Sequence, residues 1–419
     1  MSSSSTPEPL PRSPTPPHEL AVAQQLPQSV IALIAHHLTV DSSEHRHDTF
    51  ADRREDARRF ARVCRAWRAA GTAAAWREVE IERASARLVD HLEAHPELYK
   101  HIESISAPTT NVRLSPPFGG AQVVIASCPR VSRLELRCDC QPGSAFQALQ
   151  DAVDLSKLVE VVTRTIHTPW ISWHRYATAD RLVSTILLFA FLRACRNLRH
   201  FAYVGPQEHI NETVDVPCGR RIKVQSLALD IQNPSPDSET DRRSSSIRSR
   251  FLLQFDLGNL IAFKAHVNLR DNDNLAALDR MVNLETLRLV DDHGLDVVAL
   301  HALGAHIVRL VKLHDVDLSA VPEAECPTSP AVLDAVQRLL DALPASVEHL
   351  ALSVPLPEPF AEALLEGRDG LEHFHARIYD PLDVRPEARE VRWRKTVEPV
   401  YESADEWDEL DEEADGEGL

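Results

Sequence analysis

The chain has 419 residues, of which 43% are hydrophobic, so it is long enough for two unequal domains or for one elongated repeat array with a sizeable core. Its formal net charge is −18, and more than half of that excess lies in residues 402–419, which hold ten acidic residues and no Lys or Arg. The rest of the chain is also acidic, which argues against a phosphate-binding surface and predicts no nucleic-acid partner.

The N-terminal residues 1–25 are rich in Ser and Pro and lack apolar periodicity, so they are predicted to be disordered, and they contain no apolar signal-peptide core. The most apolar run, LVSTILLFAFL, is shorter than the roughly 20 residues of a membrane helix and predicts a buried helix. The seven irregularly spaced cysteines are typical of reduced thiols. We therefore expect an intracellular protein, cytoplasmic or nuclear, with no membrane partner.

Residues 26–81 carry the pattern of a three-helix unit. In LPQSVIALIAHHL apolar residues recur on one helix face, and Pro27 suits a helix start because its missing N–H costs nothing there. A second helix is predicted where apolar residues recur every three or four positions as far as Trp67. Gly71 is expected to loosen a short third helix that ends at Trp76, and the following REVEI alternates like a strand.

Residues 82–378 contain an internal repeat. Apolar residues near the spacing L-x-x-L-x-L predict ten short strands, which start 23 to 29 residues apart six times and 36 to 40 three times. Helical patterns such as PAVLDAVQRLLDAL precede nearly all of them. Because such a unit cannot bury its apolar face alone, the units must stack as a solenoid. The predicted strands are IESISA, VSRLEL, LVEVVT, LRHFAY, VQSLAL, LIAFKA, LETLRL, IVRLVK, VEHLAL and LEHFHA.

Two further segments are predicted to lack order. The insertion at 233–250, NPSPDSETDRRSSSIRSR, is expected to be a mobile loop because it has little apolar surface to bury. The repeats stop near Tyr379, and 379–419 is predicted to be an acidic disordered tail. The acidic and aromatic composition of this tail fits either an interaction segment or a purely solvating one.

The helical unit resembles the F-box, a three-helix module with the usual order Leu-Pro, Ile-x-x-x-Leu, Val-Cys-x-x-Trp and Trp. With the repeats behind it, the chain resembles an F-box protein with degenerate leucine-rich repeats, of the fungal type. The predicted fold is therefore α/β, with a three-helix F-box-like unit followed by an irregular leucine-rich-repeat-like solenoid and disordered tails at both ends. The residues that carry the resemblance are Leu26, Pro27, Ile34, Leu38, the run VCRAW and Trp76.

This resemblance implies that the helical unit docks on a Skp-type linker, which joins a cullin–RING ubiquitin ligase, while the repeats hold an unknown protein substrate. The chain would then be a substrate-recognition adaptor of an SCF-type ligase. The alternative is a scaffold that uses the same unit and repeats without joining a ligase. In the repeats, Asp139, Gln232 and Asp292 stand where Asn or Cys is usual. The candidate linker-binding residues are Leu26, Pro27, Ile31, Ile34, Val63, Cys64 and Trp67.

Catalytic and metal motifs are absent from the sequence. It contains no Gly-x-Ser-x-Gly, no phosphate-binding Gly-rich loop and no His-Glu-x-x-His, so no enzyme activity and no cofactor are predicted. His373 and His375 share one face of a predicted strand, but the paired spacing of a zinc site is missing. The sequence therefore predicts no bound metal.

One aromatic segment is a candidate substrate-binding site. Trp170, Trp173 and Tyr176 lie in PWISWHRY, between two repeats. Trp and Tyr side chains dominate binding hot spots, which favours contact with a partner. The alternative is that the segment covers an open flank of the solenoid, and the sequence leaves both interpretations open.

Overall fold

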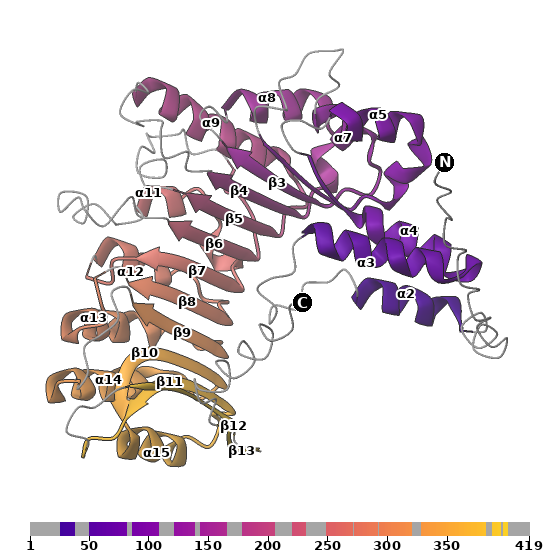
Figure 1. Ribbon diagram of the computed structural model, residues 1–419. Helices are drawn as coiled ribbons and strands as arrows, with labels where there is room; N and C mark the ends of the chain where they lie inside the picture. The colour runs from indigo at the N-terminus through magenta and orange to yellow at the C-terminus, as the bar shows by residue number, and fades with distance from the viewer. Residues whose placement is uncertain are drawn as a thin grey trace, which may run out of the picture. The chain divides into compact units, whose positions relative to one another are not determined.

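The chain has a mixed α/β fold with a mostly parallel sheet, seen in a computed structural model (Figure 1). Contacts divide it into two compact units, which are described separately. Unit 1 comprises Met1–Ser106 and Val124–Val131, and unit 2 comprises Ala107–Val123 and Ser132–Leu419. The structure describes residues 26–37, 50–81, 86–108, 121–138, 143–165, 178–205, 220–231, 249–270, 272–291, 293–320, 328–382, 388–394 and 397–400.

Unit 1 begins with three helices that share a small core of Ile31, Ala35 and Phe60. A strand follows the third helix directly and pairs in parallel with a second strand, with Val79 opposite Ile105. The predicted boundary after Ile81 therefore falls inside a compact unit, because contacts join the helices to the elements that follow. The elements are α2 (Gln28–His37), α3 (Phe50–Val63), α4 (Arg65–Arg77), β1 (Glu78–Glu80), α5 (Ala86–Ala94), η1 (Pro96–His101) and β2 (Ser104–Pro108), and α7 (Ala121–Ser127) lies at the division between the units.

The predicted second helix ends earlier than expected. α3 stops at Val63, and Cys64 has extended backbone angles (φ −158°, ψ 173°) and caps the start of α4. Trp67 therefore lies in α4, which contains Gly71 and ends at Arg77, one residue beyond the predicted end at Trp76. Gly71 is inside α4, where a Cβ atom would meet the Cβ of Ala61 at 2.6 Å and its Cα at 2.7 Å. The missing side chain lets α3 and α4 approach closely.

Unit 2 is built on strands that each pair with the next strand along the chain. From β3 to β11 these pairs are all parallel. β12 then pairs antiparallel with β11, and β13 with β12. The strands are β3 (Arg133–Cys138), β4 (Glu160–Thr165), β5 (His200–Gly205), β6 (Ser226–Ile231), β7 (Ala262–Val267), β8 (Thr286–Asp291), β9 (Asp315–Ala320), β10 (His349–Pro357), β11 (His373–Tyr379), β12 (Arg389–Arg394) and β13 (Val397–Val400).

Helices and short 3-10 turns connect the strands of unit 2 and follow one flank of its sheet (Figure 1). The alternation follows from parallel pairing, because the chain must return to the same edge before the next strand begins. Neighbouring helices also pack on each other, α8 on α9 and α13 on α14. The elements are α8 (Gly143–Ala152), η2 (Leu155–Lys157), α9 (Thr178–Ala194), α11 (Ser249–Leu252), η5 (Leu257–Asn259), α12 (Asn272–Leu278), α13 (Val297–Ile307), α14 (Pro330–Ala342) and α15 (Glu358–Gly367).

Alternate residues of each strand form the core of unit 2. Leu287 and Leu289 of β8 lie opposite Val316 and Leu318 of β9, and all four side chains are buried. The intervening residues belong to the other side of the pleat and are more exposed. We call this second side the open face. The strand sequences thus fix one apolar and one polar face, as the alternation predicts.

Nine of the ten predicted strands overlap strands of the structure, and one does not. IVRLVK, at 307–312, forms the end of α13 and a turn, and the strand that follows is β9. Ile307 and Leu310 are both buried. Their spacing of three residues fits the face of a helix as well as the first interval of the repeat, which is why the pattern was misleading.

The predicted tail begins with ordered strands, so the prediction of disorder from Tyr379 is wrong for its first part. Val391 of β12 is buried, and the Trp393 ring stacks on Phe374 of β11 with centroids 5.3 Å apart. Antiparallel pairing requires only a short connection, so a charge-rich segment without a helix can still extend the sheet. The predicted disordered segments 1–25 and 401–419, and most of the loop 233–250, lie outside the described residues.

The apolar run LVSTILLFAFL, which was predicted to form a buried helix, lies in α9. Its Phe189 and Phe191 side chains are fully buried within unit 2. Across the described part of the chain, no helix combines the length and apolar character needed to cross a bilayer.

Candidate functional site

The helical part of unit 1 contains the predicted linker-binding residues, and their exposure differs widely. Ile31 has no exposed surface, because it forms the helical core with Ala35 and Phe60. Leu26, Ile34 and Trp67 pack against that core and are only partly accessible. The Trp67 ring stacks on Phe60 with centroids 4.5 Å apart. These four predicted residues therefore contribute mainly to packing between the helices, and little of their surface is left for a partner.

The remaining predicted linker-binding residues are more accessible. Pro27 is exposed at the start of α2, Val63 is 47% exposed at the end of α3, and Cys64 is half-buried between α3 and α4. Sequence reasoning missed two further apolar side chains on α2, Val30 and Leu33, of which Leu33 is 55% exposed. Their three-residue spacing beside the buried face of α2 was the available signal.

The predicted substrate-binding aromatics Trp170, Trp173 and Tyr176 lie outside the described residues, so their role stays a prediction.

The part of unit 2 that the structure describes presents a polar surface, the open face of the sheet. In-register pairing arranges its side chains in columns that cross the strands. One column starts the strands and consists of Arg133, Glu160, His200, Ser226, Ala262, Thr286, Asp315, His349 and His373.

Opposite charges alternate across the open face and form ion pairs between neighbouring strands. Such exposed pairs contribute little to stability, typically about 0–1 kcal/mol each, so they mainly define a charge pattern. The pattern mixes both signs along the whole sheet, which suits recognition of a surface of mixed charge. The pairs are Arg133–Glu160 (3.4 Å), Arg164–Glu135 (3.3 Å), His266–Asp230 (3.3 Å), Arg288–Asp315 (3.1 Å) and His375–Glu390 (3.8 Å).

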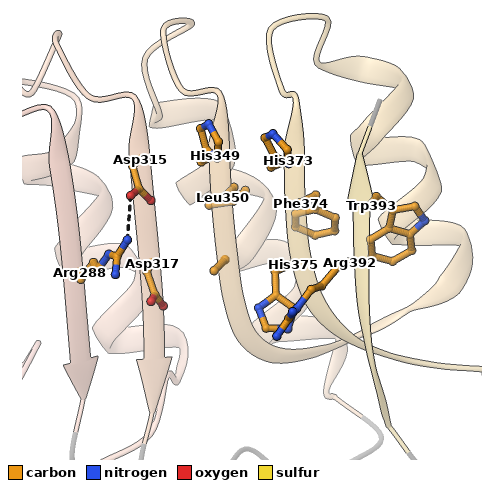
Figure 2. Close-up of a pocket in the computed structure, with 11 residues that line it drawn as sticks. Arg288, Asp315, Asp317, His349, Leu350, His373, Phe374, His375, Arg392 and Trp393 are labelled. Atoms are coloured by element: carbon orange, nitrogen blue, oxygen red, sulfur yellow. Dashed lines mark hydrogen bonds and ion pairs between the residues drawn. The ribbon is translucent and has the colours of Figure 1, made fainter. Parts of the chain in front are cut away.

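A shallow recess of about 290 Å³ lies on this face between β8 and β12 (Figure 2). Arg288 and Asp315 pair at one end, and Trp393 lies at the other. The rings of His349 and His373 stand side by side on neighbouring strands, with centroids 4.4 Å apart and planes inclined by 15°. On the open face the recess thus offers imidazole, guanidinium and carboxylate groups, which bind through charge and hydrogen bonds. The Trp393 ring belongs to the other side of the pleat, where it stacks on the buried Phe374.

One buried acidic residue supports the loops beside the open face. Asp291, at the end of β8, accepts hydrogen bonds from the backbone N–H groups of Leu269 (3.0 Å) and His293 (2.7 Å). Burial raises the pKa of its carboxyl above the ordinary value. The two hydrogen bonds and the nearby Arg270 guanidinium oppose this shift but do not cancel it. Arg270 also pairs with Asp296 at 2.8 Å. These contacts fix the turns that follow β7 and β8.

Three positions where Asn or Cys is usual in such repeats carry other residues in this sequence. Asp292, Asp139 and Gln232 all lie outside the described residues. Sequence reasoning did not single out Asp291, whose place at the end of β8 follows from the pairing of that strand with its neighbours.

In comparisons with known proteins, the chain matches no protein-family model and no curated protein sequence.

Proposed function

We propose that the chain is a non-catalytic substrate adaptor of an SCF-type ubiquitin ligase. The helices α2 to α4 dock on a Skp-type linker, and through it on a cullin, while unit 2 selects a protein substrate. The observation that carries the proposal is the set of exposed apolar side chains on these helices, Val30, Leu33 and Val63, beside a very small core.

The helical docking surface has a physical rationale. The helical core contains Ile31, Ala35 and Phe60, and the partly buried Leu26, Ile34, Trp67, Ala70 and Ala74 pack against it. A unit with so small a core is marginally stable alone, and covering exposed apolar groups with a permanent partner stabilises it. The order of Leu-Pro, VCRAW and Trp76 in the sequence supports a Skp-type linker as that partner.

Substrate selection is assigned to the open face of unit 2, together with the predicted aromatic segment. The recess between β8 and β12 combines carboxylates and imidazoles with Arg288 and Arg392, and Arg is among the residue types that dominate hot spots. The adaptor acts by proximity, because holding a substrate beside the ligase raises the effective concentration of its lysines. Ubiquitin transfer itself is performed by other subunits.

The docking half is tested by calorimetric titration of a Skp-type linker into the full chain. Leu33→Glu and Val63→Glu place a charge on exposed positions without disturbing the core, and each should weaken binding by more than about tenfold, since burying an unpaired charge is costly. The control is Val311→Glu, at a position of unit 2 that is 66% exposed. Equal affinity of all three variants would remove the basis of the proposal.

The ligase itself is tested by affinity purification and mass spectrometry. Recovery of a Skp-type linker and a cullin with the parent chain supports the adaptor. Reproducible partners without either component favour the alternative, a scaffold that uses the same unit outside a ligase.

The substrate half is tested with the partners recovered in that purification. The triple variant Arg288→Ala, His375→Ala and Arg392→Ala should lose a non-ligase partner while keeping the linker, because the three side chains line the recess. The matched comparison is the triple alanine variant at Trp170, Trp173 and Tyr176. Loss of the partner only in the aromatic variant would move recognition away from the open face.

A further inference from the structure

Three side chains able to bind a metal converge where β10 and β11 begin. His349 and His373 are directly opposite each other in the parallel register, and their rings stack at 4.4 Å. Glu372 immediately precedes β11. One ligand atom from each of the three residues can be chosen so that all lie within 4.8 Å of one another. Figure 2 shows the two imidazoles at the same level on neighbouring strands.

This convergence follows from a repeated dipeptide. Glu-His occurs as Glu348-His349 and again as Glu372-His373, at the same place in two successive strand units. The N–H groups of Glu372 and His373 both donate to the carbonyl oxygen of Glu348, at 2.8 and 2.9 Å, which fixes the two dipeptides side by side. Sequence spacing could not reveal this pair, because 24 residues separate the histidines.

We infer that His349, Glu372 and His373 form a binding site for a divalent transition metal ion, with Zn²⁺ as the favoured ion. Two imidazoles and a carboxylate suit zinc, copper or nickel, whereas calcium and magnesium prefer oxygen-only sites. The inference concerns unit 2 alone and is independent of the proposed ligase function.

The geometry needs only a small closing movement. Tetrahedral zinc holds its ligand atoms roughly 3.3 Å apart, given metal–ligand distances of about 2.0–2.2 Å. His349 and Glu372 are exposed and His373 is half-buried, so their side chains have room to turn the ring nitrogens and the carboxylate towards one ion. The backbone, held by the strand register, need not move.

The surroundings favour a cation. A second recess of about 380 Å³ is lined by Glu348, Asp369, Glu372 and His373, so three carboxylates lie around the approach to the ion. His314 contacts Glu348 at 3.7 Å and extends the polar shell. Such outer groups orient the ligands and raise metal affinity.

Three protein ligands leave a coordination position for water or for a side chain of a bound partner. His349 and His373 also line the recess between β8 and β12. A metal ion here would therefore sit at the border of the open face, where a partner's His, Cys or carboxylate could complete its coordination.

The test is calorimetric titration of ZnCl₂ into the full chain after treatment with a chelator. His349→Gln and His373→Gln should each remove one equivalent of bound Zn²⁺ or weaken it by more than about tenfold, and Glu372→Gln should weaken the same site. The matched control is His200→Gln, since His200 is exposed and starts β5 in the same column as the two ligands. Its zinc binding should equal that of the parent.

Circular dichroism without metal verifies that all four variants keep the parent fold, which their exposed or half-buried positions predict. Zn²⁺ should raise the thermal midpoint of the parent and of His200→Gln, and raise it less in the three ligand variants. The inference is overturned if the ligand variants bind Zn²⁺ with the stoichiometry and affinity of the parent, or if His200→Gln loses the same equivalent.

Discussion

The helical core of unit 1 and the sheet core of unit 2 are built in opposite ways. α2 to α4 meet through small side chains around Ile31 and Phe60, and α4 needs a glycine to approach α3. The sheet core instead repeats large buried side chains along successive strands, and the rings of Phe189 in α9, Phe251 in α11 and the nearby Phe255 pack together within the same core. The comparison shows that helices can pack with few large side chains when their backbones approach closely. The stability of such a unit then depends on a small number of contacts.

The two regions also satisfy their backbones differently. Each helix of unit 1 makes its hydrogen bonds within itself, whereas each parallel strand of unit 2 depends on the strands beside it and on side chains such as Asp291 at its turns. Damage to unit 2 should therefore spread to neighbouring strands, and damage to α2 to α4 should remain local.

The largest expected difference comes from removing one aromatic ring in each region. Phe255→Ala should cost about 4–5 kcal/mol, because three aromatic rings surround it and keep the cavity open. Phe60→Ala should cost about 3 kcal/mol, because it has one aromatic neighbour, Trp67, among smaller side chains that can close on the gap. Hydrogen exchange followed by mass spectrometry measures both. Loss of protection across several strands is expected for the first and across α2 to α4 for the second; the reverse ranking would contradict the comparison.

Removal of the buried Asp291 carboxylate tests how much its hydrogen bonds to backbone N–H groups stabilise the turns of unit 2. Asp291→Ala leaves the N–H groups of Leu269 and His293 without their acceptor, at a cost of about 2–4 kcal/mol for one buried and one partly buried donor. Thermal unfolding measures the loss. The control is Asp317→Ala on the open face, which should change the midpoint little, and equal effects would mean that burial at Asp291 does not matter.

The same carboxyl predicts a dependence on pH. Because burial raises the pKa of Asp291 in the folded chain, the folded state binds a proton more readily than the unfolded one. Stability from this group is therefore present below its ordinary pKa of 3.8 and is lost as the pH rises through the higher folded value. Relative to Asp291→Asn, the parent midpoint should fall as the pH rises over that window. A rise would reverse the direction assigned to the shift.

Gly71→Ala tests the close helix contact in unit 1. The new Cβ would overlap Ala61, and we expect a net loss of about 1–3 kcal/mol despite the better helix propensity of Ala. Gly304→Ala in α13 is the matched control, since its nearest neighbours, atoms of Leu339, lie 3.9 Å away or more. That variant should gain about 0.5–1 kcal/mol. Denaturant unfolding monitored in each region separates the two results.

The smallest effect concerns thiol accessibility. Burial raises the pKa of Cys195 in unit 2 to about 12, and Cys128 is also buried, whereas Cys64 is half-buried between α3 and α4. Iodoacetamide at mildly alkaline pH should therefore modify Cys64 faster than the other two in the native chain. Peptide mapping by mass spectrometry measures each rate, and denaturation should equalise them. Equal native rates would refute the expected difference in accessibility.

Local periodicity was sufficient for most elements of the fold. Buried strand residues such as Leu287 and Leu289 recur at the spacing that predicted a strand, and α14 matches its amphipathic sequence from Pro330 onwards. It failed where two patterns share an interval, at Ile307, and where a partner strand gives order to a polar segment, as β11 does for β12. Apolar periodicity also predicted the helices of residues 26–81 but carried the second helix on to Trp67, which lies in α4.

The candidate surfaces were less predictable, because they depend on register. The strand containing His373 was predicted, but its contact with His349 requires pairing of two strands that are distant in sequence. Likewise, helical periodicity predicted Ile31 on an apolar face. It could not show that this face packs against Phe60 within the same unit and is therefore not free for a partner. A sequence pattern gives the face of an element, and tertiary packing decides what that face contacts.

The columns of the open face also place side chains at a regular spacing across the strands. Neighbouring strands lie about 4.8 Å apart, so a partner that crosses them meets one side chain at each such step. An extended peptide repeats its same-side residues about every 6.8 Å and falls out of step within two or three strands. An α-helix repeats about every 5.4 Å and stays in step for longer. The strand spacing from β3 to β11 is therefore closer to the repeat of an α-helix than to that of an extended peptide.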